Sequence, residues 1–264
     1  MSIPLRLIVL GSWALGTIFC LLFVTSERAG KPRRTFFFKL FASLTYLGYA
    51  VALIAYTGDT QTNVLLVLGA LCFSFLADLT SSAVSQLRLR GPNHYKRIRP
   101  ALGILTGLLF IGHIVCLGLA FYRGMMDAGI DPGWRFWVIT LLPIPPIIAL
   151  DITLDLKLMN RLVHAPLLVL PILVLVVAFF LSASAIMEYG VLRMAYDPFG
   201  GLSAVLGILF YIYDTLLFAI RGTDNKLYKS YRVWAIAYVF YYIAQLSLAG
   251  SLIAFGGFGN LLLK

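Results

Sequence analysis

The chain is dominated by long runs of apolar residues that short polar segments separate. Eight of these runs approach or exceed the roughly 20 residues that an α-helix needs to cross the hydrocarbon of a bilayer. Irregular backbone that faces lipid would leave amide groups unpaired, so the runs predict helices. With ends uncertain by about 2–4 residues, the predicted spans cover residues 4–25, 36–57, 63–84, 101–122, 134–154, 167–188, 202–221 and 234–255.

The composition changes this picture only by excluding a soluble protein. Of the 264 residues, 61% are hydrophobic and 12% are charged, against about 45–50% and 25% in ordinary soluble domains. The first apolar run is longer than the core of a signal peptide and lacks a convincing small-residue cleavage site, so we interpret it as a retained helix. We therefore expect an all-α, polytopic membrane protein in which residues 1–264 form a single eight-helix transmembrane domain.

The net charge of +10 comes from basic residues that are concentrated in alternate connections. The connections after the first, third, fifth and seventh spans hold fifteen Lys and Arg residues, and the opposite side holds five. By the positive-inside rule, these four connections face the cytoplasm and both termini face the other way. Because the basic residues lie in short loops between apolar runs, the positive charge does not indicate a nucleic-acid partner.

Four ionisable side chains lie well inside predicted spans, namely Lys39, Asp78, His113 and Asp214. Each costs about 2.5–3.5 kcal/mol to insert, so each needs a partner or a cavity. At about 1.5 Å per helical residue, Asp78 and Asp214 both lie about 10 Å from the cytoplasmic ends of their spans. The polar residues that accompany them are Ser74, Tyr211, Tyr241, Tyr242 and Gln245.

Helical spacing lets these polar side chains share faces. Ser74 and Asp78 are separated by four residues, as are Tyr241 and Gln245, and Tyr211 lies three residues before Asp214. We therefore expect the helices to enclose one polar cavity in the cytoplasmic half. The competing interpretation is that the carboxyl groups only join helices by hydrogen bonds, that His113 is structural, and that Lys39 extends to the interface.

Several familiar chemistries lack their residues. The chain contains no Gly-x-Ser-x-Gly sequence for a serine hydrolase elbow and no glycine-rich phosphate loop. The three histidines, His94, His113 and His164, are not spaced as metal ligands. We therefore predict neither a metal nor an organic cofactor.

Five short blocks, one on each of five predicted helices, resemble the lysoplasmalogenase (YhhN-type) family of eight-span membrane proteins. They are Phe38-Lys39-Leu40, the segment 69–78 that ends in Ala77-Asp78, the segment 107–113 that ends in His113, the segment 207–214 that ends in Tyr213-Asp214, and Tyr241-Tyr242-Ile243-Ala244-Gln245. The chain departs from the family at three places: Ala77 stands where glycine is usual, Tyr213 where serine is usual, and Leu40 where many members have proline.

The resemblance implies a hydrolase that cleaves the vinyl ether bond of a lysoplasmalogen or a related lysolipid. The products would be a fatty aldehyde and glycerophosphoethanolamine or glycerophosphocholine. Asp78 and Asp214 would be catalytic, one as the acid and the other as an ionised partner, a division of labour that glycosidases also use. Lys39, Ser74, His113, Tyr211, Tyr241, Tyr242 and Gln245 would bind the substrate.

Two other functions fit the same intramembrane carboxyl groups. The first is a proton-coupled transporter of an amphiphile, in which the aspartates relay protons. The second is a non-catalytic lipid-binding membrane protein. The sequence leaves open the linkage of the lipid, its headgroup, which aspartate is the acid, and the oligomeric state.

Overall fold

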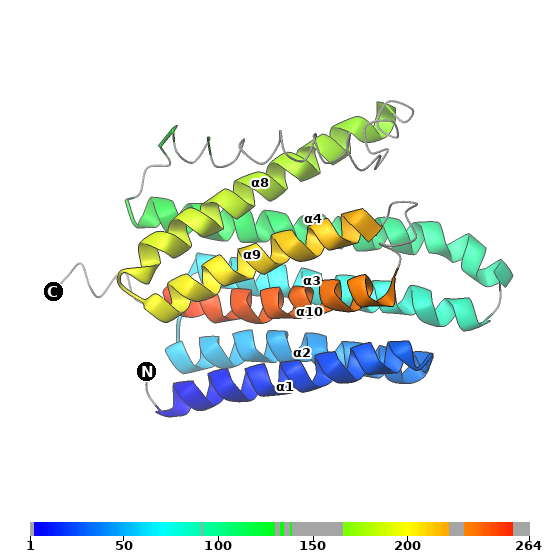
Figure 1. The fold of residues 1–264 in the computed structure, drawn as a ribbon. Coiled ribbons are helices and arrows are strands. Elements are labelled where there is room, and N and C mark those ends of the chain that lie inside the picture. Colours follow the sequence, from blue (N-terminus) through cyan, green and yellow to red (C-terminus); the bar gives the residue numbers. More distant parts are fainter. Residues whose placement is uncertain are drawn as a thin grey trace.

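The computed structural model describes residues 3–90, 92–129, 133–134, 138, 166–221 and 230–255. Within these ranges the chain is helical (Figure 1). The elements are α1 (Ile3–Arg28), α2 (Pro32–Thr57), α3 (Thr62–Arg90), α4 (Pro92–Asp127), α8 (Pro166–Met194), α9 (Pro198–Arg221), α10 (Tyr231–Gly250) and the short 3-10 helix η1 (Ser251–Ala254). The all-α prediction is therefore confirmed for the described residues.

Seven of the predicted spans correspond to helices. The span predicted over 134–154 lies outside the described residues, apart from Trp134 and Val138, so the number of eight stays a prediction. Among the described residues, six helices are long and apolar enough to cross a membrane. A helix of 26 residues such as α1 is about 39 Å long, which exceeds the thickness of the hydrocarbon layer.

The connection between the third and fourth spans differs from the prediction. We expected the helices to end at residue 84 and begin again at residue 101, but α3 continues to Arg90 and α4 already begins at Pro92. The apolar pattern marks only the part of a helix that suits lipid, whereas intrahelical hydrogen bonds extend the helix into polar sequence. Proline at the first position of α4 suits a helix start, because its missing N–H needs no partner there.

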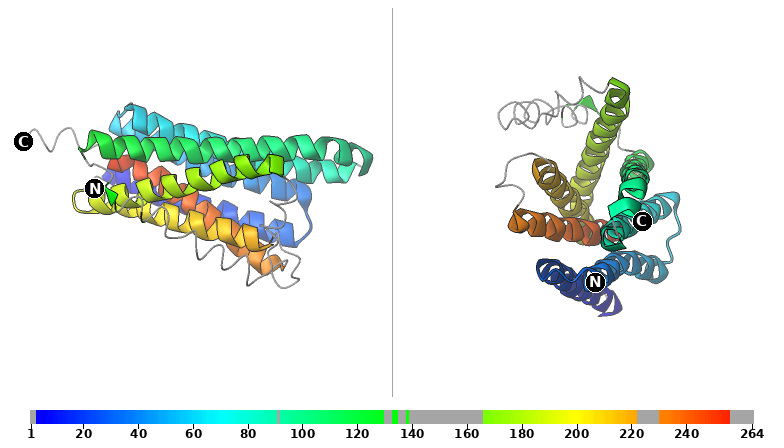
Figure 2. Two further views of the ribbon diagram at one scale, coloured as in Figure 1. Left: turned by 90° about the horizontal axis from the view of Figure 1, so that it is seen from above. Right: turned by 90° about the vertical axis from the view of Figure 1, so that its right-hand side faces the viewer.

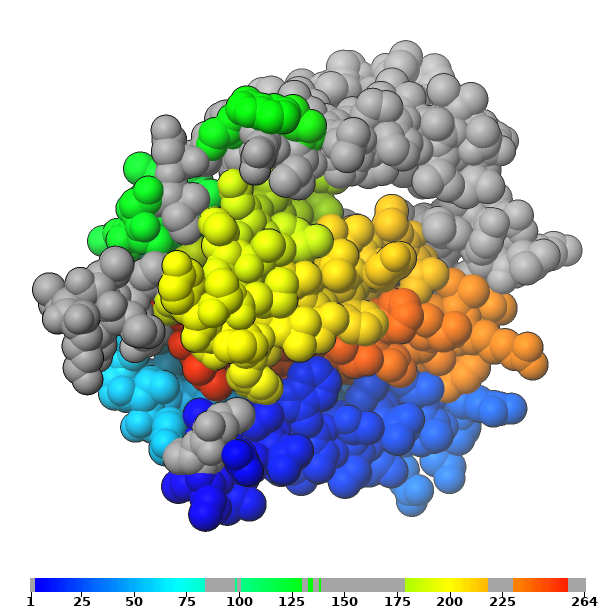
Figure 3. All heavy atoms as spheres, turned by 60° about the vertical axis from the view of Figure 1, so that its left-hand side comes forward, coloured from blue at the N-terminus to red at the C-terminus, as the bar shows by residue number. Residues whose placement is uncertain are grey.

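The helix α10 lies at the centre of the bundle. It contacts α1, α2, α3 and α9, and the end-on view places it between the α1–α2 pair and α9 (Figure 2). In its membrane-spanning window 67% of the residues are buried, against 22% in α1. The helix α1 forms an outer face of the molecule, shown in blue in Figure 3, and it exposes Leu7, Leu10 and Ile18 where lipid would cover them.

Two turns set the directions of the helices that carry the candidate site. The helix α2 begins after Lys31 with Pro32 and ends at Thr57, and it is followed by Gly58, whose backbone φ of 66° is left-handed and therefore suits glycine. The start of α1 and the end of α10 lie at the same end of the bundle (Figure 1). We call the other end, where α1 ends and α2 begins, the basic end, because it holds Arg28, Lys31, Arg33 and Arg34.

Candidate functional site: a buried carboxyl pair

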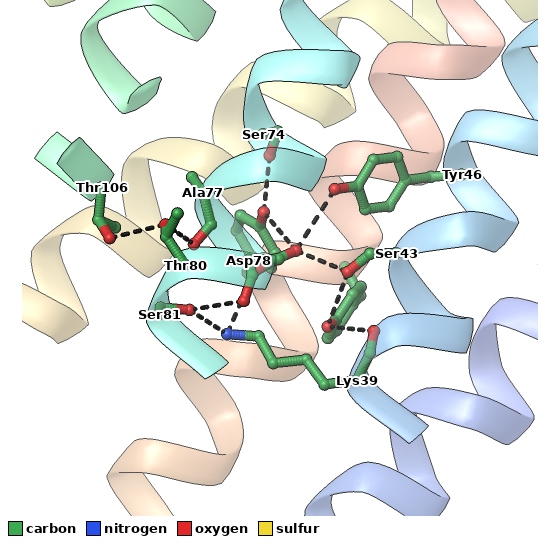
Figure 4. Close-up of polar contacts among 11 residues, drawn as sticks. Lys39, Ser43, Tyr46, Ser74, Ala77, Asp78, Thr80, Ser81 and Thr106 are labelled. Carbon is green, nitrogen blue, oxygen red and sulfur yellow. Dashed lines mark hydrogen bonds and ion pairs between the residues drawn. The ribbon is translucent and has the colours of Figure 1, made fainter. Parts of the chain in front are cut away.

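A buried ion pair joins α2 and α3. Lys39 Nζ lies 3.2 Å from Asp78 Oδ1, and both side chains are less than 10% exposed. The same ammonium group donates a hydrogen bond of 2.7 Å to Ser81 Oγ and lies 5.2 Å from the centre of the Tyr238 ring. Lys39 therefore does not extend to the interface but directs its charge inward to Asp78 (Figure 4).

The second carboxylate oxygen of Asp78 accepts hydrogen bonds from three hydroxyl groups. Ser43 Oγ lies 2.7 Å from Oδ2, Tyr241 OH 2.9 Å and Tyr46 OH 3.3 Å. These donors come from α2 and α10, so three helices converge on one carboxyl group (Figure 4). Hydrogen bonds to a carboxylate stabilise its charged form, as does the lysine.

Two further predicted residues support this cluster. Ser74 Oγ lies 2.6 Å from Tyr241 OH, and because that hydroxyl donates to Asp78, the serine is the donor to the tyrosine. Tyr242 OH lies 3.4 Å from Ser43 Oγ and 3.4 Å from the backbone oxygen of Lys39. The structure thus brings together five of the predicted residues: Lys39, Ser74, Asp78, Tyr241 and Tyr242.

Asp214 on α9 has different surroundings. It is 2% exposed, and its carboxyl Oδ1 lies 3.2 Å from Oγ1 of its neighbour Thr215, a hydroxyl that also donates to the backbone oxygen of Tyr211 at 2.7 Å. Lysine and arginine form no ion pair with Asp214 within the described residues. Within the part of the chain that the structure describes, one carboxyl group is therefore compensated by a cation, and the other is buried without one.

The two carboxyl groups lie at the same level of the bundle. The ring of Tyr213, which precedes Asp214, packs against Phe240, which precedes the Tyr241 that contacts Asp78. The level inferred from sequence is thus supported by contacts between α9, α10 and α3.

The remaining predicted residues lie deeper. His113 and Gln245 are fully buried, and Tyr211 is 5% exposed. His113 Nδ1 lies 2.8 Å from the backbone oxygen of Ala70, and its ring packs edge-on against Tyr211 at 5.3 Å between ring centres. Because Tyr211 precedes Asp214 by one helical turn, this contact connects His113 with the second carboxyl group.

The single polar cavity expected from sequence is not confirmed. A narrow surface crevice, with no room for a water molecule, lies between α2 and α3. Its lining residues are Phe36, Lys39, Leu40, Ser43, Phe75, Asp78, Leu79 and Ser82. Asp78 therefore borders the crevice, whereas Asp214 does not, because the side chains of α9 and α10 pack together on the far side of the cluster.

Three residues that hydrogen-bond to Lys39 or Asp78 were not predicted from the sequence, namely Ser43, Tyr46 and Ser81. Ser43 and Tyr46 lie four and seven residues after Lys39, so they share its helix face, and that spacing was a usable signal. Within the part of the chain that the structure describes, no group of three or more His, Cys, Asp or Glu side chains is arranged to hold a metal ion.

Comparison with known proteins gives no relative. No protein-family model, curated protein or solved structure matches this chain.

Proposed function

We propose that this protein is an integral-membrane hydrolase that cleaves the vinyl ether bond of a lysoplasmalogen or a related lysolipid. The products would be a fatty aldehyde and glycerophosphoethanolamine or glycerophosphocholine. The observation that carries the proposal is the pair of buried carboxyl groups with opposite surroundings: Asp78 has a lysine and three hydroxyl donors, whereas Asp214 contacts its neighbour Thr215 and, among the described residues, pairs with no lysine or arginine.

Asp78 is suited to be the ionised member of the pair. The adjacent ammonium group of Lys39 and three O–H donors all favour a negative charge on its oxygens. A fixed carboxylate next to a reacting centre stabilises positive charge that develops there, and it does so strongly where water is excluded. Asp78 would therefore stabilise the oxocarbenium ion that forms when a vinyl ether is protonated.

Asp214 is suited to be the acid. A buried carboxylate without a cation is costly, so the neutral carboxylic acid is the favoured form in such surroundings. Two carboxyl groups whose environments differ in this way provide one proton donor and one stabilising anion.

The reaction then balances with these two groups and one water molecule. Asp214 transfers its proton to the β-carbon of the vinyl ether, whose π electrons form the new C–H bond and leave an oxocarbenium ion. The oxygen of water bonds to the cationic carbon, and the proton released returns to Asp214. The hemiacetal collapses when its C–O bond to glycerol breaks, so that its hydroxyl proton passes to the glycerol oxygen and an aldehyde remains.

The crevice between α2 and α3 marks the place where a lipid would reach Asp78 once these helices separate. Its walls include apolar side chains such as Phe36, Phe75 and Leu79, whereas Lys39 and Asp78 provide polar groups. This combination matches an amphiphile with one hydrocarbon chain and a polar head. Ligand pockets occupy roughly 300–1,000 Å³, whereas this crevice has no room for a water molecule, so binding requires α2 and α3 to separate.

The test is to incubate the purified protein with a panel of lysolipids that carry vinyl ether, alkyl ether or ester linkages, and to identify the products by mass spectrometry. We expect aldehyde from the vinyl ether lipid alone. Asp78→Asn and Asp214→Asn should each abolish its release while the protein remains folded in detergent.

A matched control is Asp127→Asn, which alters a carboxyl group that is more than half exposed at the end opposite the basic end and should leave the activity unchanged. Full activity in either Asp78→Asn or Asp214→Asn would refute the proposal. Transport of a lysolipid into proteoliposomes without any product would support a carrier instead.

A further inference from the structure

Two fully buried side chains just below the carboxyl pair have polar atoms without a hydrogen-bond partner in the described part of the protein. They are His113, through its Nε2 atom, and Gln245, through both atoms of its amide group. Buried polar atoms are nearly always satisfied by protein or by a bound molecule, because an unpaired one costs about 1–3 kcal/mol. Three such atoms at one level therefore point to a ligand.

The helix register places these atoms at the same depth in the bundle. The contact between Ser74 and Tyr241 fixes the alignment of α3 with α10. Since these helices run in opposite directions, Ala70 and Gln245 are each one turn, about 6 Å, deeper than that contact. His113 is bonded to the backbone oxygen of Ala70, so it lies at the level of Gln245.

The side chains also lean toward the carboxyl groups. Side chains in an α-helix tilt toward the N-terminus of the helix. Helices α4 and α10 begin at the basic end, so His113 and Gln245 tilt toward Asp78, whereas α3 runs the other way and tilts Asp78 toward them.

The hydrogen-bond roles identify the ligand chemistry. A carbonyl oxygen only accepts, so the 2.8 Å contact with Ala70 requires His113 Nδ1 to carry the hydrogen. In the neutral ring, Nε2 is then an acceptor. The amide of Gln245 offers donors and an acceptor. The molecule that satisfies both residues must donate to one and accept from the other, which is the property of a hydroxyl group or of water.

We propose that His113 and Gln245 bind the water molecule that attacks the oxocarbenium ion. A polar lipid headgroup that enters from the basic end would be directed toward Lys39 and Asp78. His113 and Gln245 lie deeper in the bundle than those residues, so their position favours water over the glycerol hydroxyl of a lipid. This inference rests on the proposed function. His113 and Gln245 orient the water oxygen toward the cationic carbon, and the water proton passes to Asp214 as described above.

The test is a labelling experiment in D₂O with two variants. His113→Asn retains an amide donor for the Ala70 oxygen but removes Nε2, and Gln245→Met retains the volume without the amide. If capture of the cation slows, the cation returns a proton to Asp214 more often, and unreacted vinyl ether acquires deuterium at its β-carbon. We expect aldehyde release to fall about tenfold or more, while the ratio of exchange to hydrolysis rises by a similar factor.

The control is Tyr49→Phe, which removes another buried hydroxyl without a described partner, near Gly250 and away from this level. Its exchange ratio should equal that of the unaltered protein. If the ratio of exchange to hydrolysis is unchanged in His113→Asn and Gln245→Met, whether activity is lower or KM is raised, the proposal that these residues bind the attacking water is refuted. Absence of aldehyde with the unaltered protein would instead refute the proposed function, so the two failures are distinguishable.

Discussion

Lys39→Met tests whether Asp78 is charged in the resting protein. The substitution keeps the apolar stem of the side chain and removes the ammonium group that lies 3.2 Å from Asp78. With an effective dielectric constant of about 20, the attraction lost is roughly 5 kcal/mol. The three hydroxyl donors to Asp78 remain, but hydrogen bonds in membrane proteins average only about 0.6 kcal/mol each, or about 2 kcal/mol together.

The ion pair is therefore the dominant contribution, and Lys39→Met should lower the free energy of unfolding by about 3–5 kcal/mol. Unfolding by SDS in mixed micelles measures this value. The double variant Lys39→Met/Asp78→Asn should lose at least about 2 kcal/mol less of the free energy of unfolding than the sum of the losses in the two single variants. The reason is that the double variant leaves no buried charge unpaired.

Arg123→Met is the matched control for this cycle. Arg123 also forms an ion pair, at 3.8 Å with Asp127, but those side chains are 56% and 57% exposed. Its loss should change the free energy of unfolding by no more than about 0.5 kcal/mol. A Lys39→Met protein as stable as that control would show that Asp78 carries no charge, and the division of roles between the aspartates would fail.

Two other predictions concern packing and the support of Asp78. Gly201→Ala places a Cβ 2.5 Å from the backbone nitrogen of Met194 and should destabilise the protein by about 2–3 kcal/mol. The control Gly48→Ala meets nothing within 4 Å and should stabilise the protein by up to about 1 kcal/mol. Equal melting temperatures for the two variants would contradict this prediction. Ser43→Ala removes the 2.7 Å hydrogen bond to Asp78, which contributes about 1 kcal/mol. If the bond persists in the transition state, its loss slows aldehyde release about fivefold. An undiminished rate would argue against a role for this bond.

The sequence predicts the helices well because the length of an apolar run is a local property. Spacing likewise identifies Ser74 with Asp78 and Tyr241 with Gln245 as residues on shared faces. How helices rotate about their own axes and which neighbours they contact depends on packing across the bundle, so the convergence of Ser43 and Tyr46 on Asp78 was not predicted.

The direction of Lys39 shows the same limit. In sequence it lies about four residues inside its span, a depth from which a lysine can extend to the interface. The structure instead pairs it with Asp78 and Ser81, because a carboxylate on the adjacent helix is nearer than the membrane surface. The cavity was expected from the depth, spacing and polarity of these side chains, whereas in the structure the polar groups around Asp78 satisfy one another by hydrogen bonds, and a narrow crevice lies beside Asp78.

The origin of one hydrogen atom tests the central claim most directly. If Asp214 protonates the β-carbon of a vinyl ether, hydrolysis in D₂O must place one deuterium on the carbon beside the aldehyde group of the product. Trapping the aldehyde as it forms and measuring its mass gives the answer. We expect the singly deuterated aldehyde from the unaltered protein and none from Asp214→Asn; a fatty acid product, or an aldehyde without deuterium at that carbon, would contradict the account.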